Sequence, residues 1–326
     1  MKVRPTQRLR DATKRNGFIL SEELNMEGFT MFTIYHRSEQ GGGFKLRLRV
    51  ARLGDLFLHE EIVPTEFERL VNTLRNDRAL QHPIIVDDGS NVILDGMHRV
   101  AALQKLGFLY IVACGVNYYN PLIEVKSWFR VFTGPPWDEK VLDRVGQLTD
   151  CTIEELSTSQ FQEKMKTGHA VTGFILPMRE TIPTVAIDRS SPDAKQIYDK
   201  LIEIERVVLR SGFNIEYKSE PIAREAVETG RASFALATKR LLKEEVIRVA
   251  TRGEVFPPKT TRHVIPVRPL FINVPLRLLS TEGPGKDEEE RNKILDAFLR
   301  QRRLVKVRGH ITLDRFYEED YLYLFT

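Results

Sequence analysis

Residues 95–99, Asp-Gly-Met-His-Arg, are the stretch whose residue types best suit chemistry on a phosphate, and we call them the 95–99 motif. Two short apolar runs, 83–86 and 91–94, precede the motif, and a helix-forming run that stops at Gly107 follows it. This pattern predicts a strand, a tight turn, a returning strand and then a helix. The motif would therefore lie at a helix N-terminus, where backbone N–H groups and the helix dipole attract anions.

Each polar residue of the motif has a chemical use at such a place. Gly96 would let a phosphate approach the backbone, and His98 and Arg99 would donate hydrogen bonds to it. Asp95 would hold a metal ion or orient a hydroxyl group. The plainer alternative is that Asp95 only caps the helix and that Arg99 pairs on the helix surface.

A second candidate lies at residues 56–64, where His59, Glu60 and Glu61 stand between apolar residues directly before a predicted helix. Phosphorylation of a hydroxyl group requires a carboxylate that orients the nucleophile and accepts its proton. Glu60 or Glu61 could do this, and the sequence does not separate them. The alternative is that both carboxylates only favour the start of the helix through its dipole.

A third candidate follows the double proline at 257–258, which fixes the backbone in an extended path. The five donor side chains that come next are Lys259, Thr260, Thr261, Arg262 and His263. Lysine would act on a phosphate or carboxylate as a point charge and arginine as a bidentate fork. The alternative is a rigid surface loop whose basic residues are solvated.

The elements that must position these residues follow from hydrophobic periodicity. Residues 44–50 alternate and predict a half-buried strand with a basic solvated face, and residues 110–116 predict a buried strand. Residues 125–132 predict an edge strand or a short helix, which contains Ser127 and Trp128. A tryptophan at such a place is more often part of the core than of a site.

From residue 151 onward the pattern predicts a second unit of mixed helices and strands. The predicted strands are 170–176, 184–187, 213–217 and 233–237, and the predicted helices are 191–210, 222–228, 243–251 and 291–303. The aromatic and acidic tail at 318–325 would dock on the body of the protein or on a second subunit.

Composition places the chain among ordinary globular proteins. Its 326 residues carry a net charge of +4 with 29% charged residues, which gives no support for a dedicated nucleic-acid-binding protein. The two cysteines, Cys114 and Cys151, show no metal or disulfide pattern and favour a reducing compartment. No apolar run has the ~20 residues of a membrane span and the N-terminal residues 1–5 lack an apolar signal core, so we expect a cytoplasmic protein.

The 95–99 motif resembles the short strand-to-helix motif of the ParB/sulfiredoxin superfamily, whose members use it to hold nucleotide phosphates. Sulfiredoxins carry a catalytic cysteine directly before the His-Arg pair, and Met97 stands there in this sequence. Because a thioether is not the thiolate nucleophile that a sulfinic acid requires, sulfiredoxin chemistry is excluded. The Asp-Gly-x-His-Arg form is most similar to the nucleotide-dependent free-serine kinases and their uncharacterised relatives.

Three further segments resemble these kinases in order and approximate spacing, between about residues 44 and 263. The glutamates at 60 and 61 match the catalytic glutamate segment, and Ser127 with Trp128 matches a pair that lines the amino-acid pocket. The Pro-Pro-Lys-Thr-Thr run matches a segment near the end of the kinases. The sequence departs from them at Met97, where they often have a second histidine.

The resemblance implies an α+β protein with a ParB/sulfiredoxin-like N-terminal core, a second α/β C-terminal domain and an active site in the cleft between them. We expect an N-terminal extension at 1–42, a nucleotide-binding domain at 43–150 and a C-terminal α+β domain at 151–326. The oligomeric state is left open.

The implied activity is that of a kinase of amino-acid metabolism, which transfers a phosphoryl group from ADP or ATP to the hydroxyl of L-serine with Mg²⁺. The implied catalytic residues are Glu60 or Glu61, Asp95 (also the metal ligand) and His98. Nucleotide and phosphate would bind at Gly96, Met97, His98, Arg99 and Lys259. The amino acid would bind at Ser127, Trp128, Thr260, Thr261, Arg262 and His263.

Two other classes of protein fit part of these observations. In the first, the chain is a ParB-like regulator that binds a nucleotide as a switch and acts on DNA or a partner, so that its glutamates are dispensable. The absence of a recognisable helix-turn-helix pattern and the modest net charge disfavour this class. In the second, the chain is a catalytically silent relative that binds a metabolite, which the departure at Met97 keeps open.

Overall fold

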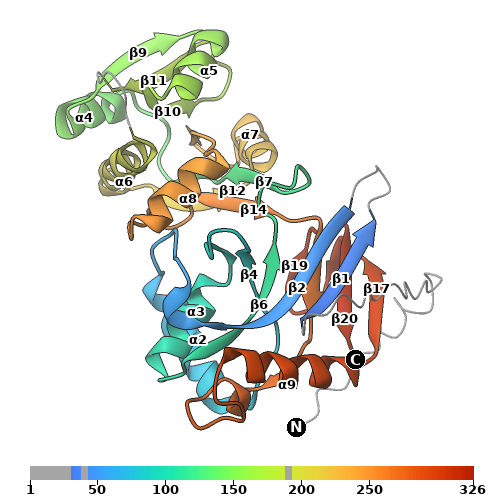
Figure 1. Cartoon of the computed structure of the whole chain (residues 1–326). Helices are drawn as coiled ribbons and strands as arrows, with labels where there is room; N and C mark the ends of the chain where they lie inside the picture. The colour runs from blue at the N-terminus through green and yellow to red at the C-terminus, as the bar shows by residue number, and fades with distance from the viewer. Residues whose placement is uncertain (1–30, 38–42, 188–192) are drawn as a thin grey trace. The chain divides into compact units, whose positions relative to one another are not determined.

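The computed structural model describes residues 31–37, 43–187 and 193–326. They form two compact units, each assembled from separate stretches of the chain (Figure 1). The first unit holds the described residues up to Leu58, residues Ile62–Glu124 and residues His263–Thr326. The second unit holds residues His59–Glu61 and Val125–Arg262. The mixture of helices and strands confirms the α+β class expected from the sequence.

The expected domains were contiguous and divided at residue 150, whereas these units interleave along the chain. The reason is strand pairing between distant segments, which hydrophobic periodicity does not reveal. Apart from residues His59–Glu61, the chain enters the second unit within β7 (Glu124–Ser127) and leaves it within β14 (Thr261–Val264). Of the expected N-terminal extension, only residues 31–37 lie among the described residues.

The first unit contains a five-stranded sheet in the order β1-β2-β6-β4-β5. Its strands are β1 (Phe32–Arg37), β2 (Gly43–Arg52), β4 (Ile84–Asp87), β5 (Ile93–Asp95) and β6 (Tyr110–Val116). The predicted alternation over residues 44–50 is confirmed, because every second side chain of β2 is buried. The helices α2 (Pro64–Asn76) and α3 (Met97–Lys105) pack against each other beside β4, and η1 (Leu53–Asp55) follows β2.

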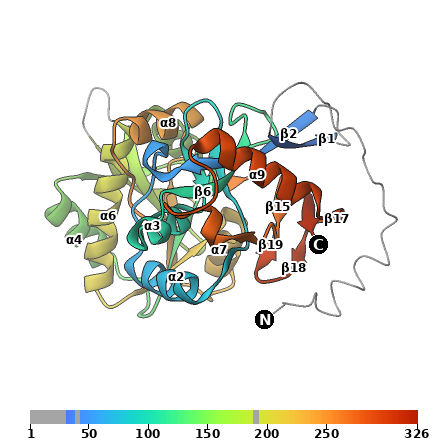
Figure 2. The same cartoon turned by 60° about the horizontal axis from the view of Figure 1, so that its bottom comes forward.

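A second sheet of the first unit is built from the C-terminal residues, in the order β15-β20-β17. Its strands are β15 (Val267–Leu270), β17 (Leu304–Arg308) and β20 (Tyr321–Phe325), and α9 (Glu288–Arg300) packs on β1 and β2 (Figure 2). Shorter elements are β3 (Ala79–Leu80) paired with β16 (Val274–Pro275), η2 (Leu276–Leu278), and β18 (Ile311–Thr312) paired with β19 (Phe316–Tyr317). The tail therefore docks within this unit through β20, which is parallel to β15.

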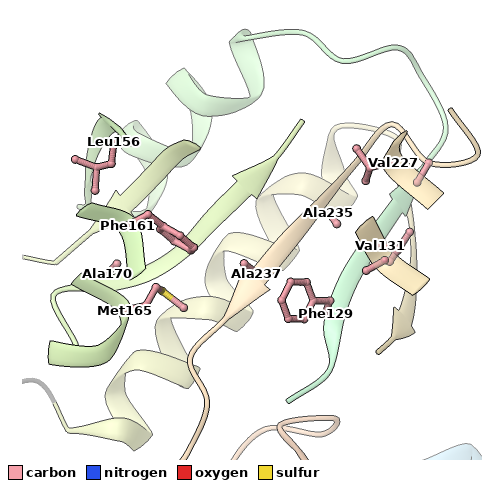
Figure 3. Close-up of a cluster of buried hydrophobic side chains, with 11 residues drawn as sticks. Phe129, Val131, Leu156, Phe161, Met165, Ala170, Val227, Ala235 and Ala237 are labelled. Carbon is pink, nitrogen blue, oxygen red and sulfur yellow. The ribbon is translucent and has the colours of Figure 1, made fainter. Parts of the chain in front are cut away.

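The second unit contains a six-stranded antiparallel sheet in the order β12-β8-β13-β10-β11-β9. The strands are β8 (Phe129–Thr133), β9 (Thr152–Leu156), β10 (Ala170–Ile175), β11 (Ile182–Ala186), β12 (Asn214–Lys218) and β13 (Phe234–Thr238). The helices are α4 (Lys140–Thr149), α5 (Thr158–Thr167), α6 (Ala194–Arg210), α7 (Glu220–Glu228) and α8 (Lys243–Thr251). The side chains of α5 and α7 close one apolar cluster against the sheet (Figure 3).

The expected edge strand or short helix at 125–132 is strand in the structure, and β7 forms a two-stranded sheet with β14, but the expected edge position is wrong for residues 129–132. Residues 129–133 form β8, which lies inside the sheet between β12 and β13. Phe129 and Val131 enter the cluster of Figure 3, while Arg130 points to the opposite face and is fully buried against Glu205 of α6. A charged residue in the middle of the segment made an internal strand resemble an exposed one. Within the described ranges, no helix is long and apolar enough to cross a membrane.

Candidate functional site

The 95–99 motif has the strand-to-helix geometry that its sequence predicts. Strand β5 ends at Asp95, and Gly96 is the residue before α3, with a left-handed backbone at φ 101° and ψ 21°. A Cβ atom at position 96 would lie 2.5 Å from Ile84 Cγ2 and 2.8 Å from Arg99 Nη2. Glycine is therefore required both by the backbone conformation and by the lack of space.

The Asp95 carboxylate is held by two arginines of the first unit. Its Oδ2 atom accepts a hydrogen bond from Arg99 Nη2 at 2.6 Å and another from Arg268 Nη1 at 2.7 Å. Burial alone would raise the pKa of Asp95, but the charges of Arg268 and Arg99 hold that pKa well below its usual range. The carboxylate is therefore charged at any physiological pH and fixed in one orientation.

Arg99 also donates from Nη1 to the carbonyl oxygens of His82 at 3.1 Å and Pro83 at 2.8 Å. The side chain thus ties the first turn of α3 to the segment that leads into β4. His98 makes a comparable link, because its Nε2 accepts a hydrogen bond from the backbone N–H of Val63 at 3.1 Å. A ring nitrogen that accepts a hydrogen bond carries no proton, so the proton of a neutral His98 ring is on Nδ1.

The second unit contains a buried carboxylate that organises the predicted donor segment. Glu60 Oε1 accepts from the Thr261 hydroxyl at 2.5 Å and from the Thr261 backbone N–H, and its Oε2 accepts from the backbone N–H of Lys259 at 3.1 Å. Lys259 has a left-handed backbone with φ 60°, and Thr260 Oγ1 donates to the Pro257 carbonyl at 2.8 Å. The double proline and Glu60 therefore hold residues 259–261 in one conformation.

The structure separates the two glutamates that the sequence left equivalent. Glu60 is buried, whereas Glu61 is exposed. The backbone N–H of Glu61 donates a hydrogen bond to the Phe256 carbonyl. His59 is fully buried, and its Nε2 lies 2.8 Å from the Thr261 hydroxyl. The hydroxyl of Thr261 thus lies between an imidazole and a carboxylate.

Trp128 and Arg262 complete the group in the second unit. The indole Nε1 of Trp128 donates to the Thr261 carbonyl at 3.0 Å, and the Arg262 guanidinium lies 5.5 Å from the centre of the indole ring. Ser127 is the last residue of β7 and is half-buried. His263 belongs to the first unit, where its Nε2 lies 2.7 Å from the hydroxyl of the buried Tyr118.

The candidate residues therefore gather into two groups, one in each unit. The first-unit group contains Asp95, Gly96, Met97, His98, Arg99 and His263, and the second-unit group contains Glu60, Glu61, Ser127, Trp128, Lys259, Thr260, Thr261 and Arg262. Sequence reasoning missed Arg268 and Tyr118. The available signal for Arg268 is a charged residue between Val267 and Pro269, in a short segment that the structure buries completely as β15.

The described residues do not fit a metal ion held by Asp95. Its Oδ2 already receives two guanidinium groups, which repel a cation from the same place. In the described part of the chain, no group of three or more histidine, cysteine, aspartate or glutamate residues could hold a metal ion. The expectation of Asp95 as a metal ligand thus has no support in the geometry.

The fold and the strand-to-helix motif are similar to those of the ParB/sulfiredoxin-like superfamily. No family model matches the sequence. The proteins to which it is similar include L-serine kinases: an ATP-dependent L-serine kinase of Staphylothermus marinus is 27% identical over 226 residues, which cover 68% of this chain and 86% of that protein. An ADP-dependent L-serine kinase of Thermococcus kodakarensis is 27% identical over 225 residues, covering 68% of this chain and 88% of that protein.

Solved structures agree with this relationship. A free serine kinase in complex with AMP has a TM-score of 0.57 and 25% identity, covering 71% of this chain and 93% of that chain. A C-terminally truncated SbnI of Staphylococcus aureus has a TM-score of 0.60 at 17% identity, covering 78% of this chain and 96% of its own, and shows the likeness of fold alone. The resemblance inferred from the sequence is thereby confirmed.

Proposed function

We propose that the protein transfers a phosphoryl group from ADP or ATP to the hydroxyl of free L-serine and releases O-phosphoserine. The observation that carries this proposal is the buried Glu60 carboxylate, which three donors from residues 259–261 hold in place in a homologue of L-serine kinases. A fixed carboxylate is what phosphorylation of an alcohol needs from the protein besides phosphate binding.

Glu60 is the proton acceptor in this proposal. A carboxylate offers about four acceptor sites, and three hydrogen bonds fill two sites on Oε1 and one on Oε2. The remaining site on Oε2 would take the serine hydroxyl, whose proton moves to Glu60 as the hydroxyl oxygen bonds to the terminal phosphorus. The bond from that phosphorus to the bridging oxygen breaks, and the nucleotide leaves with one phosphate fewer.

The 95–99 motif would hold the phosphates of the nucleotide. Gly96 gives access to the backbone, and the first N–H groups of a helix have no partner within the helix. His98 and Arg99 would add positive charge or hydrogen-bond donors. Mg²⁺ would enter with the nucleotide, coordinated mainly by phosphate oxygens and water, because Asp95 does not fit as its ligand.

The serine molecule would bind beside Trp128. Arg262 stacks near the indole ring and would receive the serine carboxylate, while Ser127, Thr260 and Thr261 would shape the pocket. The two groups of residues belong to different units. The proposal therefore requires both units for turnover.

The test is to incubate the protein with Mg²⁺, ADP or ATP, and L-serine, and to follow phosphorus NMR. The expected result is a new phosphomonoester signal and its loss in the Glu60→Gln variant. The matched control is Glu61→Gln, which changes the neighbouring exposed carboxylate and should keep at least a third of the wild-type kcat. Equal activity of Glu60→Gln and wild type would refute Glu60 as the base.

A second candidate function rests on one further homologue. A ParB-like protein of Sulfolobus acidocaldarius is 26% identical over 206 residues, covering 63% of this chain and 84% of that protein. A nucleotide-binding regulator would bind ADP or ATP without forming phosphoserine. Tight nucleotide binding with no phosphorylated product in the same NMR experiment would favour that function.

A further inference from the structure

Asp95 is held by an arginine from outside the 95–99 motif. Arg268 lies in β15, 173 positions further along the chain, and donates from Nη1 to Asp95 Oδ2 at 2.7 Å. The Arg268 side chain is only 8% exposed, so water competes little for this contact. Such a pair fixes orientation as well as charge.

Arg268 is itself oriented by Glu319. Arg268 Nε donates to Glu319 Oε1 at 2.5 Å, and the Glu319 side chain is 9% exposed. Glu319 stands just before β20, whose parallel pairing with β15 sets Arg268 opposite Leu322. Burial alone would lower the pKa of Arg268, but Asp95 and Glu319 raise that pKa above its usual value, so the guanidinium stays charged.

Gly309 shows how closely the chain packs around Glu319. A Cβ atom at position 309 would lie 1.4 Å from the Glu319 carbonyl oxygen, and the Gly309 N–H donates to the Asp320 carbonyl at 2.8 Å. The backbone that carries Glu319 is therefore fixed on the end of β17. The Glu319 side chain therefore reaches Arg268 from a fixed point of the backbone.

Glu319, Arg268, Asp95 and Arg99 thus form a row of alternating charge that ends at the first turn of α3. Two carboxylates balance two guanidinium groups, and each inner member touches two partners. Removal of one member leaves a buried neighbour without its counter-charge, which costs more than the pair itself contributes. The row therefore behaves as a unit.

We propose that Arg268 and Glu319 are positioning residues for nucleotide binding: Glu319 orients Arg268, and Arg268 holds Asp95 in the conformation that also receives Arg99. Neither residue touches the nucleotide in this proposal. The inference rests on the proposed function, because it assigns the phosphates to the 95–99 motif. A displacement of about 1 Å of a group that binds a ligand is enough to weaken its contribution to binding strongly.

The test uses Arg268→Lys and Glu319→Gln. Lysine keeps the charge but lacks the fork that reaches both carboxylates, and glutamine keeps an acceptor oxygen but loses the charge. We expect each variant to raise the KM and the calorimetric Kd for ADP about tenfold, the effect of one lost hydrogen bond to a charged group. The KM for serine should stay within about twofold, since serine is assigned to the other unit.

The double variant tests whether Glu319 acts on nucleotide binding only through Arg268 or independently of it. If Glu319 acts only through Arg268, Arg268→Lys/Glu319→Gln should bind ADP no more weakly than Arg268→Lys alone, so the effects are not additive. Additive losses would overturn the proposed order of action. ADP affinities equal to wild type in both single variants would overturn the whole inference.

The matched control is Glu205→Gln in the second unit. Arg130 Nε donates to Glu205 Oε1 at 2.5 Å, and both side chains are buried, so this pair has the same geometry as Arg268 with Glu319. We expect Glu205→Gln to lower Tm without changing the Kd for ADP. An equal rise in the Kd for ADP in this control would show a general effect of instability and overturn the positioning role.

The failure of this inference differs from the failure of the proposed function. If wild-type protein forms no phosphoserine, the kinase proposal fails, and the Kd for ADP still tests Arg268 and Glu319. If wild-type protein forms phosphoserine and the variants bind ADP normally, only the positioning role fails.

Discussion

The Thr261 hydroxyl lies 2.5 Å from Glu60 Oε1, although 201 positions of sequence separate the two residues. The same hydroxyl lies 2.8 Å from His59 Nε2. All three side chains are buried, so each hydrogen bond replaces water that cannot reach the group. Through this contact, residues 259–261 after the double proline hold the Glu60 carboxylate in one orientation.

The variant Thr261→Val keeps the side-chain volume and removes the hydroxyl. We expect a free energy of unfolding lower by about 1–3 kcal/mol, because buried partners lose a hydrogen bond, together with a kcat at least about tenfold lower, because Glu60 loses its orientation. Urea unfolding and phosphoserine formation measure the two effects. Thr184→Val is the control: its buried hydroxyl donates to the Ile182 carbonyl at 2.9 Å in β11, and only stability should change.

The variant Gly96→Ala should lose nucleotide binding. The new Cβ would meet Ile84 and Arg99 at 2.5 and 2.8 Å, and the backbone has φ 101°. Gly107, at the other end of α3, has φ 80°, but a Cβ atom there would meet no atom within 4 Å. We therefore expect Gly107→Ala to cost only about 1 kcal/mol of stability with an unchanged Kd for ADP. Equal ADP binding by the two variants would contradict the assignment of phosphates to the 95–99 motif.

The first unit should lose stability in acid through Asp314. Burial alone would raise the pKa of Asp314, but its hydrogen bond and attraction to His82 lower that pKa to about 2. A folded-state pKa below the ordinary value of about 3.9 means that Asp314 stabilises the fold above pH 4 and stops doing so as the pH falls to 2. We expect the Tm of Asp314→Asn to fall less than that of wild type between these values. Parallel Tm curves would show that Asp314 makes no such contribution.

The two tryptophans, Trp128 and Trp137, allow serine binding to be followed by fluorescence. In Trp137→Phe the remaining indole is Trp128, which donates to Thr261 beside Arg262. We expect serine to change the emission of Trp137→Phe and to leave that of Trp128→Phe unchanged. A response confined to Trp128→Phe would place the amino-acid site away from Trp128.

The parts of the site that the sequence predicts are those made by consecutive residues. Strand β5, Gly96 and helix α3 follow one another directly, so periodicity and one glycine are enough to place the 95–99 motif. The alternating strand β2 is predictable for the same reason. Local pattern carries this information because each residue's role depends on its neighbours in the chain.

The contacts that the sequence does not predict join distant residues. Arg268 reaches Asp95 only because β15 pairs with β20 and the chain returns to the first unit after residue 262. The choice between Glu60 and Glu61 depends in the same way on where residues 259–261 fold. Neither the Arg268–Asp95 contact nor the burial of Glu60 can be read from one segment of the sequence. Whether a charged side chain is buried depends on the partners that fold against it.

The interleaving of the two units also has a consequence for synthesis on the ribosome. Residues 125–262 contain all strands of the second sheet and can assemble as soon as they emerge, while β20, which pairs with both β15 and β17, is translated about sixty residues later. Until Glu319 and β20 have emerged, Arg268 has one carboxylate instead of two. The 95–99 motif, which is translated early, would thus gain its last supporting contacts only when β20 has emerged.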